Sequence, residues 1–584
     1  MKPASLFVVF VVAKAAGLMG HHVPLSWWSP IAYFWQDALV VLVFAAIDRV
    51  LSRRQRIAWT VYTVVALYAV LNIPVVRALS TPLTAAMWRA ARGPLADSIW
   101  LYATWPNMLV CAAAAACACL APLCVRRAPR LPIVAPLAAC ALLGPTAVAH
   151  VDTLGLERNA WTALALSLVP RISAASGDTD WRASGFDQTP PEDQSSGGRL
   201  RGGAAGRNIV LVSLESTAAA YLGVYGAKPD VMPHLSELAR TAIVFDSAYA
   251  VYPESIKGLF SILCSAYPSF DSPAEMYAAL PCRSLPEMLA GAGYATALFH
   301  SGRFMYLGME AVVRDRGYHV LEDAGDIGGH HTSSFGVDEP STVDRILAWI
   351  DSVPQDRPFF VTYLPIAGHH PYETPEGGPF SERDDFGRYR NALHYGDRAL
   401  GALMQGLEVR GRQQNTLWIV LGDHGEAFGQ HEGNYGHTFH LYDENVRVPF
   451  LISASGLFPR QIHSRQVVSL IDTAPTALEM VGITPPADYQ GRSMLDGGPR
   501  MALFFADYSL GMLGLRDGPR KFIYELDSGR SRMFDLDMDP GERLDVAGGN
   551  MERAREYERL LRGWSAAQKR RLVANRDADA LSRR

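Results

Sequence analysis

The sequence is poor in charged residues. Charged side chains make up 19% of the 584 residues and hydrophobic ones 49%, whereas soluble domains carry roughly 25% charge, so part of the chain is not expected to face water. A basic excess is also lacking, because 54 basic residues stand against 58 acidic ones. These figures exclude the broad positive surface of a nucleic-acid-binding protein. At roughly 150 residues per domain, the length excludes a single small binding module.

Cysteine is scarce in the polar part of the chain. Five of the seven cysteines lie inside apolar runs, where the residue behaves as a small hydrophobic side chain. The other two, Cys264 and Cys282, lie among polar residues. If this part lies outside the cytoplasm, we expect a disulfide between them. Two buried free thiols are the alternative.

Apolar residues are concentrated before residue 150. Several apolar stretches approach the roughly 20 residues that a membrane-spanning helix needs, and they lie at residues 6–19, 31–47, 57–79, 108–125 and 131–148. The first is short but lacks a convincing cleavage site, so we expect a membrane anchor rather than a removed signal peptide. The sequence therefore predicts a transmembrane domain of about five helices over residues 1–150.

Basic residues in two loops predict the orientation of this domain. They are Arg53, Arg54 and Arg56 between the second and third stretches, and Arg126, Arg127 and Arg130 between the fourth and fifth. Loops rich in arginine stay in the cytoplasm. With five crossings, the N-terminus is expected in the cytoplasm and everything after residue 150 on the outer side.

The composition changes again after the membrane domain. Residues 173–207 are dense in Ser, Gly, Pro and charge, which is typical of a flexible linker. Residues 157–170 before it predict a short amphipathic helix on the membrane surface, or a continuation of the fifth helix. The predicted domains are therefore a juxtamembrane helix and linker over 151–207, a second folded domain over 208–545, and a charged helix and tail over 546–584.

Strand-like and helix-like runs alternate from residue 208 onward. The strand-like runs lie at residues 209–214, 243–246, 295–299, 359–364, 417–421 and 449–452, and helices are expected near 232–241 and 284–292. This alternation predicts an α/β domain with a mostly parallel sheet. In such sheets the chemistry gathers at the C-terminal ends of the strands.

Acidic and imidazole side chains follow two of these strands. Glu215 comes directly after the first strand, and Asp423 and His424 come after the strand at 417–421. Two carboxylates and an imidazole suit a borderline cation such as zinc or manganese. Taken singly, each acid is more often a helix cap or an ion-pair partner, so the prediction depends on their occurring together.

The order of motifs in this half resembles the sulfatase-type branch of the alkaline phosphatase superfamily over about residues 208–544. In chain order the motifs are NIVLVSLESTAAAYLGVYG, MPHLSELARTAIVFDSAYA, YPESIKGLFSILCSAYPS, GYATALFHSGR, AGHHPY, LGDHGE, YDENVRVPFLI, VSLIDTAPTALEMVGI and MFDLDMDPGE. Together with the membrane domain, the chain is most similar to lipoteichoic acid synthases and lipid A phosphoethanolamine transferases. The resemblance implies a sulfatase-like catalytic domain.

The resemblance also implies a nucleophile and the ligands of one divalent metal ion, zinc or manganese. In this family the nucleophile lies thirteen residues before a proline, here Pro268, which gives Ser255. The implied metal ligands are Glu215, Ser255, Asp423 and His424. A bound metal lowers the pKa of a hydroxyl and so activates serine near neutral pH. A helix N-cap role for Ser255 is the alternative, and the two roles are compatible.

The family assigns further residues to the substrate. His369 in AGHHPY would contact the transferred group or act as acid or base, with His370 as the less favoured neighbour. Substrate contacts are implied for His300, Arg303, His437, His440 and Lys257. His437 is preferred to His440 by spacing, and surface or solvated roles remain open for His300, Arg303 and Lys257. The Cys264–Cys282 disulfide would brace the helix that follows the nucleophile.

The sequence departs from the sulfatase pattern in two ways. Conversion of the nucleophile to formylglycine needs Pro or Ala two places on and Arg four places on, but here Lys257 and Leu259 stand there. Sulfatases carry paired aspartates after the first strand, but here the pair is Glu215-Ser216, as in the lipid-headgroup transferases. The transferases usually have threonine as nucleophile, so Ser255 departs from their pattern too.

These residues favour a metal-dependent phosphotransferase in a bacterial inner membrane, with its catalytic domain on the periplasmic side. It is expected to transfer phosphoethanolamine or phosphoglycerol from a membrane phospholipid to an envelope glycan or glycolipid, through a covalent phospho-serine. A sulfatase or phosphoester hydrolase of the same fold, with water as acceptor, is the alternative. A membrane scaffold with a decayed enzyme domain is a third interpretation, which the intact set of ligands opposes. The donor headgroup, the acceptor and the metal stay open.

Overall fold

The computed structural model describes residues 1–91, 103–127, 133–173, 181, 197–278, 280–330 and 336–582. Much of the predicted linker, and Arg130 in the fourth loop, lie outside the described residues. The chain divides into two compact units. Unit 1 comprises Met1–Arg171 with the segments Gly429–Tyr435 and Tyr508–Leu510, and unit 2 comprises Ile172–Phe428, Gly436–Asp507 and Gly511–Arg584.

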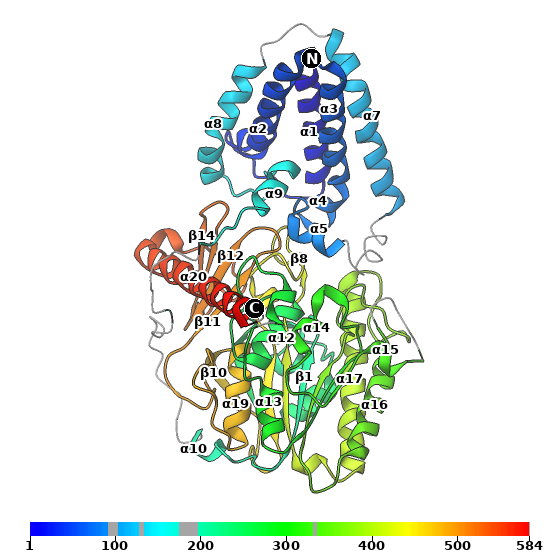
Figure 1. Cartoon of the computed structure of the whole chain (residues 1–584), viewed down its shortest axis with the longest axis vertical. Coiled ribbons are helices and arrows are strands. Elements are labelled where there is room, and N and C mark those ends of the chain that lie inside the picture. Colours follow the sequence, from blue (N-terminus) through cyan, green and yellow to red (C-terminus); the bar gives the residue numbers. More distant parts are fainter. Residues whose placement is uncertain are drawn as a thin grey trace. The chain divides into compact units, whose positions relative to one another are not determined.

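Unit 1 is helical, and helices cover all five apolar stretches (Figure 1). Its helices are α1 (Lys2–Leu18), α2 (Ser29–Val50), α3 (Gln55–Leu71), α4 (Ile73–Leu79), α5 (Ala85–Ala91), α7 (Trp105–Arg127), α8 (Val134–His150) and α9 (Ala160–Ser167). Three segments of the described chain are long and apolar enough to cross a membrane, namely Ser29–Arg53, Gln55–Leu79 and Trp105–Val125. Helices α1 and α8 have 17 residues each, or about 25 Å at 1.5 Å per residue.

Unit 2 is built on a large, mostly parallel sheet, as the alternation of strands and helices predicts. Its strand order is β10-β2-β9-β6-β1-β5-β3-β4. The strands are β1 (Asn208–Leu214), β2 (Ala242–Tyr249), β3 (Ala295–His300), β4 (Val320–Glu322), β5 (Phe359–Leu364), β6 (Thr416–Gly422), β9 (Phe450–Ala454) and β10 (Ile462–Ser469). Strand β9 runs antiparallel to both neighbours, β2 and β6, and the other pairs are parallel.

Both faces of this sheet are buried, which explains the continuous apolar character of its central strands. In β1, Ile209 and Leu211 belong to one hydrophobic core, and Val210 and Val212 belong to the other. The first core includes side chains of α12 (Ser255–Cys264), α13 (Leu285–Gly291) and α19 (Thr473–Met480). The second includes side chains of α11 (Pro233–Ala239), α16 (Glu339–Ser352) and α17 (Asp385–Val409).

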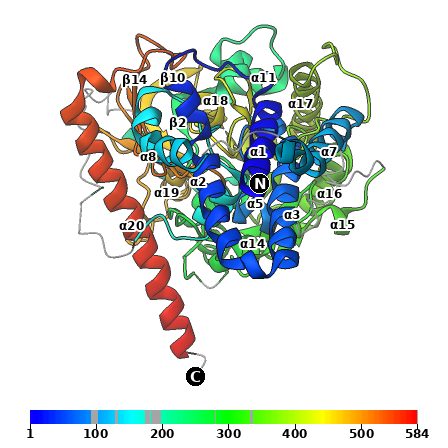
Figure 2. The same cartoon turned by 90° about the horizontal axis from the view of Figure 1, so that it is seen from above.

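Shorter elements and a second sheet complete unit 2. The short elements are α10 (Gly197–Leu200), α14 (Glu310–Val313), α15 (Ala324–Ile327), α18 (Asp443–Val446) and β7 (Ala427–Phe428). Strand β8 (Tyr435–Gly436) lies where the chain passes from unit 1 back to unit 2. The antiparallel sheet consists of β11 (Met501–Ala506), β12 (Met512–Asp517), β13 (Arg520–Glu525) and β14 (Ser531–Asp535). The chain then forms the long helix α20 (Met551–Ser582), whose far end projects from unit 2 in Figure 2.

Candidate active site

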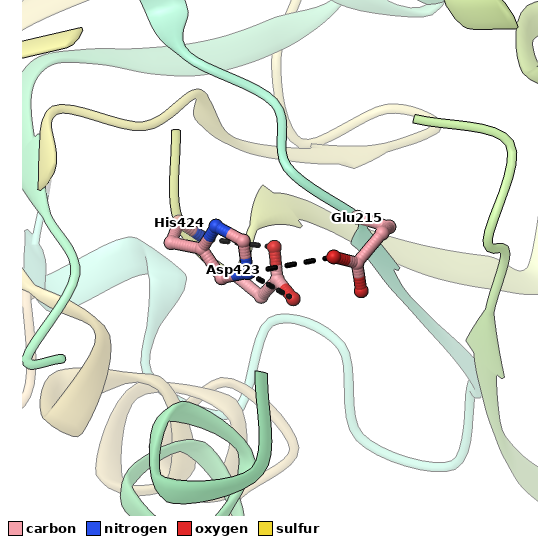
Figure 3. Close-up of side chains that lie close together, drawn as sticks. All are labelled: Glu215, Asp423 and His424. Carbon is pink, nitrogen blue, oxygen red and sulfur yellow. Dashed lines mark hydrogen bonds and ion pairs between the residues drawn. The ribbon is translucent and has the colours of Figure 1, made fainter. Parts of the chain in front are cut away.

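Parallel pairing of β1 with β6 brings the predicted metal ligands together. Leu214 and Gly422 are in register at the ends of these two strands, so the residues that follow them lie side by side. Glu215, Asp423 and His424 are all buried and each offers a ligand atom, and these atoms lie within 4.8 Å of one another (Figure 3). The carboxylate, carboxylate and imidazole therefore converge at one edge of the sheet, as predicted for its C-terminal edge.

Backbone groups hold these ligands in place. The Asp423 Oδ1 atom accepts hydrogen bonds from the backbone N–H groups of Ser216 at 3.0 Å and His424 at 2.7 Å. His424 Nδ1 lies 3.0 Å from the carbonyl oxygen of Gly425. With Nδ1–H donating to that carbonyl, Nε2 faces the two acids, 3.4 Å from Glu215 Oε1 and 3.5 Å from Asp423 Oδ2. Ser216 has a φ of 52°, an uncommon value for a residue other than glycine, as found at functional sites.

Ser255 is the first residue of α12, and its hydroxyl lies against the ligand cluster. Its Oγ donates to Glu215 Oε2 at 2.8 Å and lies 3.2 Å from His424 Nε2. The N-cap residue of α12 is Glu254, whose side chain accepts from the backbone N–H of Lys257. The capping role that was open for Ser255 is thus filled by its neighbour. An anion bound near Ser255 would face the N-terminus of a ten-residue helix.

The three clustered side chains shift one another's pKa values. Burial, followed by the negative charge of Glu215, raises the pKa of Asp423 to about 8. Burial disfavours the charged form of His424, but Asp423 and Glu215 outweigh it and raise the pKa of this imidazole to about 10. Burial likewise opposes ionisation of Glu215, yet its contacts with His424 hold the pKa of Glu215 well below its usual range. Without a metal, the cluster therefore holds protons on both His424 and Asp423 at neutral pH.

A divalent ion fits this arrangement. Two buried carboxylates, one imidazole nitrogen and the adjacent Ser255 hydroxyl form an oxygen and nitrogen donor set that suits zinc and manganese alike. The ion would take the place of the proton that His424 otherwise carries, because a metal-bound imidazole is neutral. The donor atoms do not discriminate between the two metals.

His437 lies beside the cluster, and a carboxylate orients it. Its ring centroid is 4.2 Å from that of His424 and 6.3 Å from that of His369. The Nδ1 atom of His437 lies 2.6 Å from Glu426 Oε2, and Glu426 also accepts from the hydroxyl of Tyr372. His369 Nδ1 lies 2.6 Å from the carbonyl oxygen of His370. Burial lowers the pKa of His369, so its ring is neutral at neutral pH.

The other expected substrate contacts lie on surrounding elements. His300 ends β3, and its Nδ1 lies 3.0 Å from the carbonyl oxygen of Leu364 at the end of β5. Arg303 follows β3 by three residues and is half-buried. His440 is buried and stacks on Tyr442, with ring centroids 6.0 Å apart. Of the two histidines before YDENVRVP, His437 is therefore the one whose ring packs against a candidate metal ligand.

Lys257 forms an ion pair with Asp507, which directly follows β11 of the antiparallel sheet. Its Nζ lies 2.9 Å from Asp507 Oδ2 and 3.1 Å from Oδ1, and 4.4 Å from the ring centroid of Tyr252. The Tyr252 hydroxyl and the backbone N–H of Asp271 also donate to Asp507, at 2.6 and 2.7 Å. Lys257 is thus buried in a network that holds the first turn of α12.

A disulfide joins Cys264, the last residue of α12, to Cys282. It connects the end of the helix to the loop before α13. Both ends of α12 are therefore tied down, by the Asp507 network at the first turn and by the disulfide at the last.

Sequence reasoning missed four residues that shape this site. Glu426 orients His437, Tyr372 donates to Glu426, Glu254 caps α12 and Asp507 holds Lys257. Glu426 had a signal in the sequence, because it ends the LGDHGE motif that contains two ligands. Asp507 had none, since it lies 250 residues after Lys257.

Comparison with known proteins places this site in a family. Residues 207–483 match the family described as Sulfatase. A lipoteichoic acid synthase-like protein of Bacillus subtilis is 24% identical over 316 residues, which are 50% of this chain and 50% of that protein. Arylsulfatase K of Xenopus laevis is 27% identical over 243 residues, which are 37% of this chain and 45% of that protein. The chain thus spans about half the length of the curated relatives it matches.

The fold is also found among solved structures. A protein in the alkaline phosphatase superfamily from Vibrio parahaemolyticus superposes with a TM-score of 0.53 at 19% sequence identity, covering 69% of this chain and 94% of that one. At this identity the likeness concerns the fold, which is alkaline phosphatase/sulfatase-like with a mostly parallel sheet. The match of residues 207–483 to the Sulfatase family agrees with this fold. Residues 207–483 therefore form a sulfatase family domain.

Proposed function

We propose that this protein is a membrane-anchored phosphotransferase. It moves a phospho-substituted headgroup, phosphoethanolamine or phosphoglycerol, from a membrane phospholipid to a hydroxyl or phosphate of an envelope glycan or glycolipid. The observation that carries the proposal is the position of Ser255 Oγ, 2.8 Å from Glu215 Oε2 and 3.2 Å from His424 Nε2. The lipoteichoic acid synthase-like relative supports phosphoglycerol transfer at the level of the family.

In the first step, Ser255 Oγ forms a bond to the phosphorus of the donor and gives up its proton to Glu215 Oε2, which accepts that proton in the hydrogen bond. The bond from phosphorus to the diacylglycerol oxygen breaks, and this oxygen takes a proton from His437, whose ring Glu426 orients through Nδ1. A metal bound at Glu215, Asp423 and His424 would lower the pKa of the serine hydroxyl and balance charge on the phosphoryl oxygens.

In the second step, the acceptor replaces the enzyme on phosphorus. His369, neutral because burial lowers its pKa, takes the proton of the acceptor hydroxyl, and the acceptor oxygen bonds to phosphorus. The bond between phosphorus and Ser255 Oγ then breaks, and the serine takes its proton back from Glu215. His369 releases the acceptor proton to solvent and His437 takes one up, which restores the starting state of both rings. Residues that never contact phosphorus, Glu426 among them, keep the imidazoles oriented.

The location follows from the same proposal. Apolar helices of unit 1 support an anchor in the bacterial inner membrane, and the arginine-rich loops favour a catalytic domain on the periplasmic side. The donor is then a lipid of the same membrane, and the acceptor is a component of the envelope.

Hydrolysis is the second candidate, because Arylsulfatase K is also among the relatives. In that case water replaces the glycan acceptor, and the substrate is a sulfate or phosphate ester. Lys257 and Leu259 stand where formylglycine formation needs other residues, which favours an unmodified serine and so favours phosphoryl transfer.

Mass analysis of the peptide that contains Ser255, in protein purified from its native membrane, tests the proposal. We expect a phosphoethanolamine or phosphoglycerol adduct on Ser255, absent from the Ser255→Ala variant. Diacylglycerol release from labelled phospholipid by the same preparations measures turnover, which Ser255→Ala should abolish. Formylglycine at position 255, or undiminished diacylglycerol release by the alanine variant, would overturn the transfer mechanism.

A further inference from the structure

A pocket of about 50 Å³ opens beside His369. Its walls come from the start of α16, from the loop that follows β5, and from α17. The loop after β5 also passes against the metal site, since a Cβ added to Gly368 would lie 2.2 Å from the carbonyl oxygen of Glu215. His369 is thus shared by the pocket and the surroundings of the cluster, and Glu215 is among the charges that act on its imidazole.

The size of the pocket restricts what can enter it. A water-sized group needs about 10–15 Å³ of cavity volume, so the pocket, at about 50 Å³, holds about three to five atoms other than hydrogen. An aminoethyl group or the three carbons of a glycerol fit this limit. A whole sugar ring does not.

The described side chains that give this pocket its charge are acidic. Among the described residues that line it, Asp338, Glu339 and Glu373 are acidic and none is lysine or arginine. The two lining histidines, His369 and His370, are uncharged at neutral pH because burial lowers the pKa of each ring. A second phosphate or another anion would therefore be repelled, and a cation would be attracted.

The three acids differ in what already binds them. The Glu339 carboxylate accepts from Ser301, Tyr363 and the backbone N–H groups of Ile366 and Ala367. The Asp338 carboxylate accepts from the backbone N–H and hydroxyl of Ser341 through one oxygen. Glu373 is exposed and has no hydrogen bond or ion pair with any residue that the structure describes. It is the acid in this pocket whose charge is available to a ligand.

We propose that this pocket binds the aminoethyl end of the transferred headgroup and that Glu373 pairs with its ammonium. The inference rests on the proposed function and makes it more specific, because it selects an ethanolamine phospholipid over a glycerol phospholipid as donor. The phosphoryl group lies at Ser255 and the ammonium lies beyond His369. Glu373 is then a specificity residue that does not touch the reacting phosphorus.

Equilibrium binding to the full-length Ser255→Ala protein, in detergent and with manganese, tests the pocket without turnover. The probes are O-phosphoethanolamine, glycerol phosphate and glucosamine. We expect O-phosphoethanolamine to bind at least tenfold more tightly than glycerol phosphate. Glu373→Gln should bring the two within about threefold by weakening only the former. Glu376→Gln is the matched control, because this nearby exposed acid pairs with Arg398 and does not line the pocket.

Other outcomes overturn the inference. Equal affinities for the two phosphate probes, or equal weakening of both by Glu373→Gln, would show that the pocket does not recognise the ammonium. Glucosamine binding that depends on Glu373 would refute the size limit. The proposed function fails separately: a phosphoglycerol adduct on Ser255 would refute this pocket and keep the transfer mechanism. Selective binding of the ammonium-bearing probe, together with formylglycine at position 255, would keep the pocket and refute the transfer mechanism.

Discussion

At the scale of single residues, buried carboxylates do most to shape this site. Glu215 and Asp423 converge on His424, Glu426 orients His437, and Glu339 holds the backbone that leads to His369 through Ile366 and Ala367. A carboxylate taken out of water is costly unless it is paired or hydrogen-bonded. Each of these acids therefore has partners that also position a neighbouring functional group.

Glu339 should make stability depend on pH. Burial raises its pKa from 4.5 to about 7, so in the interval between these values the folded protein holds a proton that the unfolded chain releases. Stability from this group therefore falls as pH rises through that interval, by on the order of 3 kcal/mol in total. We expect Glu339→Gln to reduce the difference in the free energy of unfolding between pH 5 and pH 8, measured on the full chain in detergent. The exposed Glu376→Gln should keep the wild-type difference, and an unchanged difference in Glu339→Gln would contradict the assignment.

At the scale of elements, α12 is the helix that positions the candidate nucleophile, and it is held at both ends. Its first residue is the candidate nucleophile, and its far end is joined to Cys282. The first turn is anchored by Lys257, whose ammonium is paired with Asp507. The helix packs its apolar side chains into the core on one face of the large sheet. Anchoring at both ends fixes where Ser255 Oγ lies relative to the ligands on β1 and β6.

Removing one partner of the Lys257–Asp507 pair should destabilise the domain. Both side chains are less than a tenth exposed, so Asp507→Ala leaves a buried ammonium unpaired, which costs about 3–5 kcal/mol. We expect a lower midpoint in denaturant for this variant and loss of transfer in proportion to unfolding.

The paired variant distinguishes charge from packing. Lys257→Met combined with Asp507→Leu removes both charges and keeps most of the volume, so it should recover most of the lost stability. If the double variant is as unstable as Asp507→Ala, the cost lies in the Tyr252 and Asp271 hydrogen bonds rather than in the unpaired lysine.

At the scale of the whole molecule, the site exists only in the folded chain. Glu215 and Asp423 are more than two hundred residues apart in sequence, and Ser255 comes from a third element. A metal that binds these ligands in the folded state and not in the unfolded chain stabilises folding by mass action. Among its described residues, unit 1 also has three segments that are long and apolar enough to cross a membrane.

Metal removal should therefore lower stability. At a free metal concentration 100 times Kd, binding contributes about 2.7 kcal/mol. We expect a chelator to lower the unfolding midpoint of the full chain and manganese or zinc to restore it. In Glu215→Gln combined with Asp423→Asn the shift should disappear. A metal-induced shift of full size in that variant would mean that the ion binds elsewhere.

Local patterns determined much of this protein from the sequence alone. Strands β1, β3, β5 and β6 lie where continuous apolar runs predict them, and helices cover the five apolar stretches, because hydrophobic patterning is a property of neighbouring residues. The ligands Glu215, Asp423 and His424 could be chosen because each directly follows a buried strand. Because the C-terminal ends of parallel strands lie at one edge of a sheet, these three residues could be expected to lie close together.

The tertiary structure alone decided which side chains pair over long distances. It gave Lys257 the partner Asp507, gave His437 rather than His440 a place beside His424, and formed the pocket at His369 from α16, α17 and the loop after β5. It also placed β9 antiparallel and built the sheet β11–β14. These features depend on contacts between segments far apart in the chain, and no local periodicity encodes such contacts.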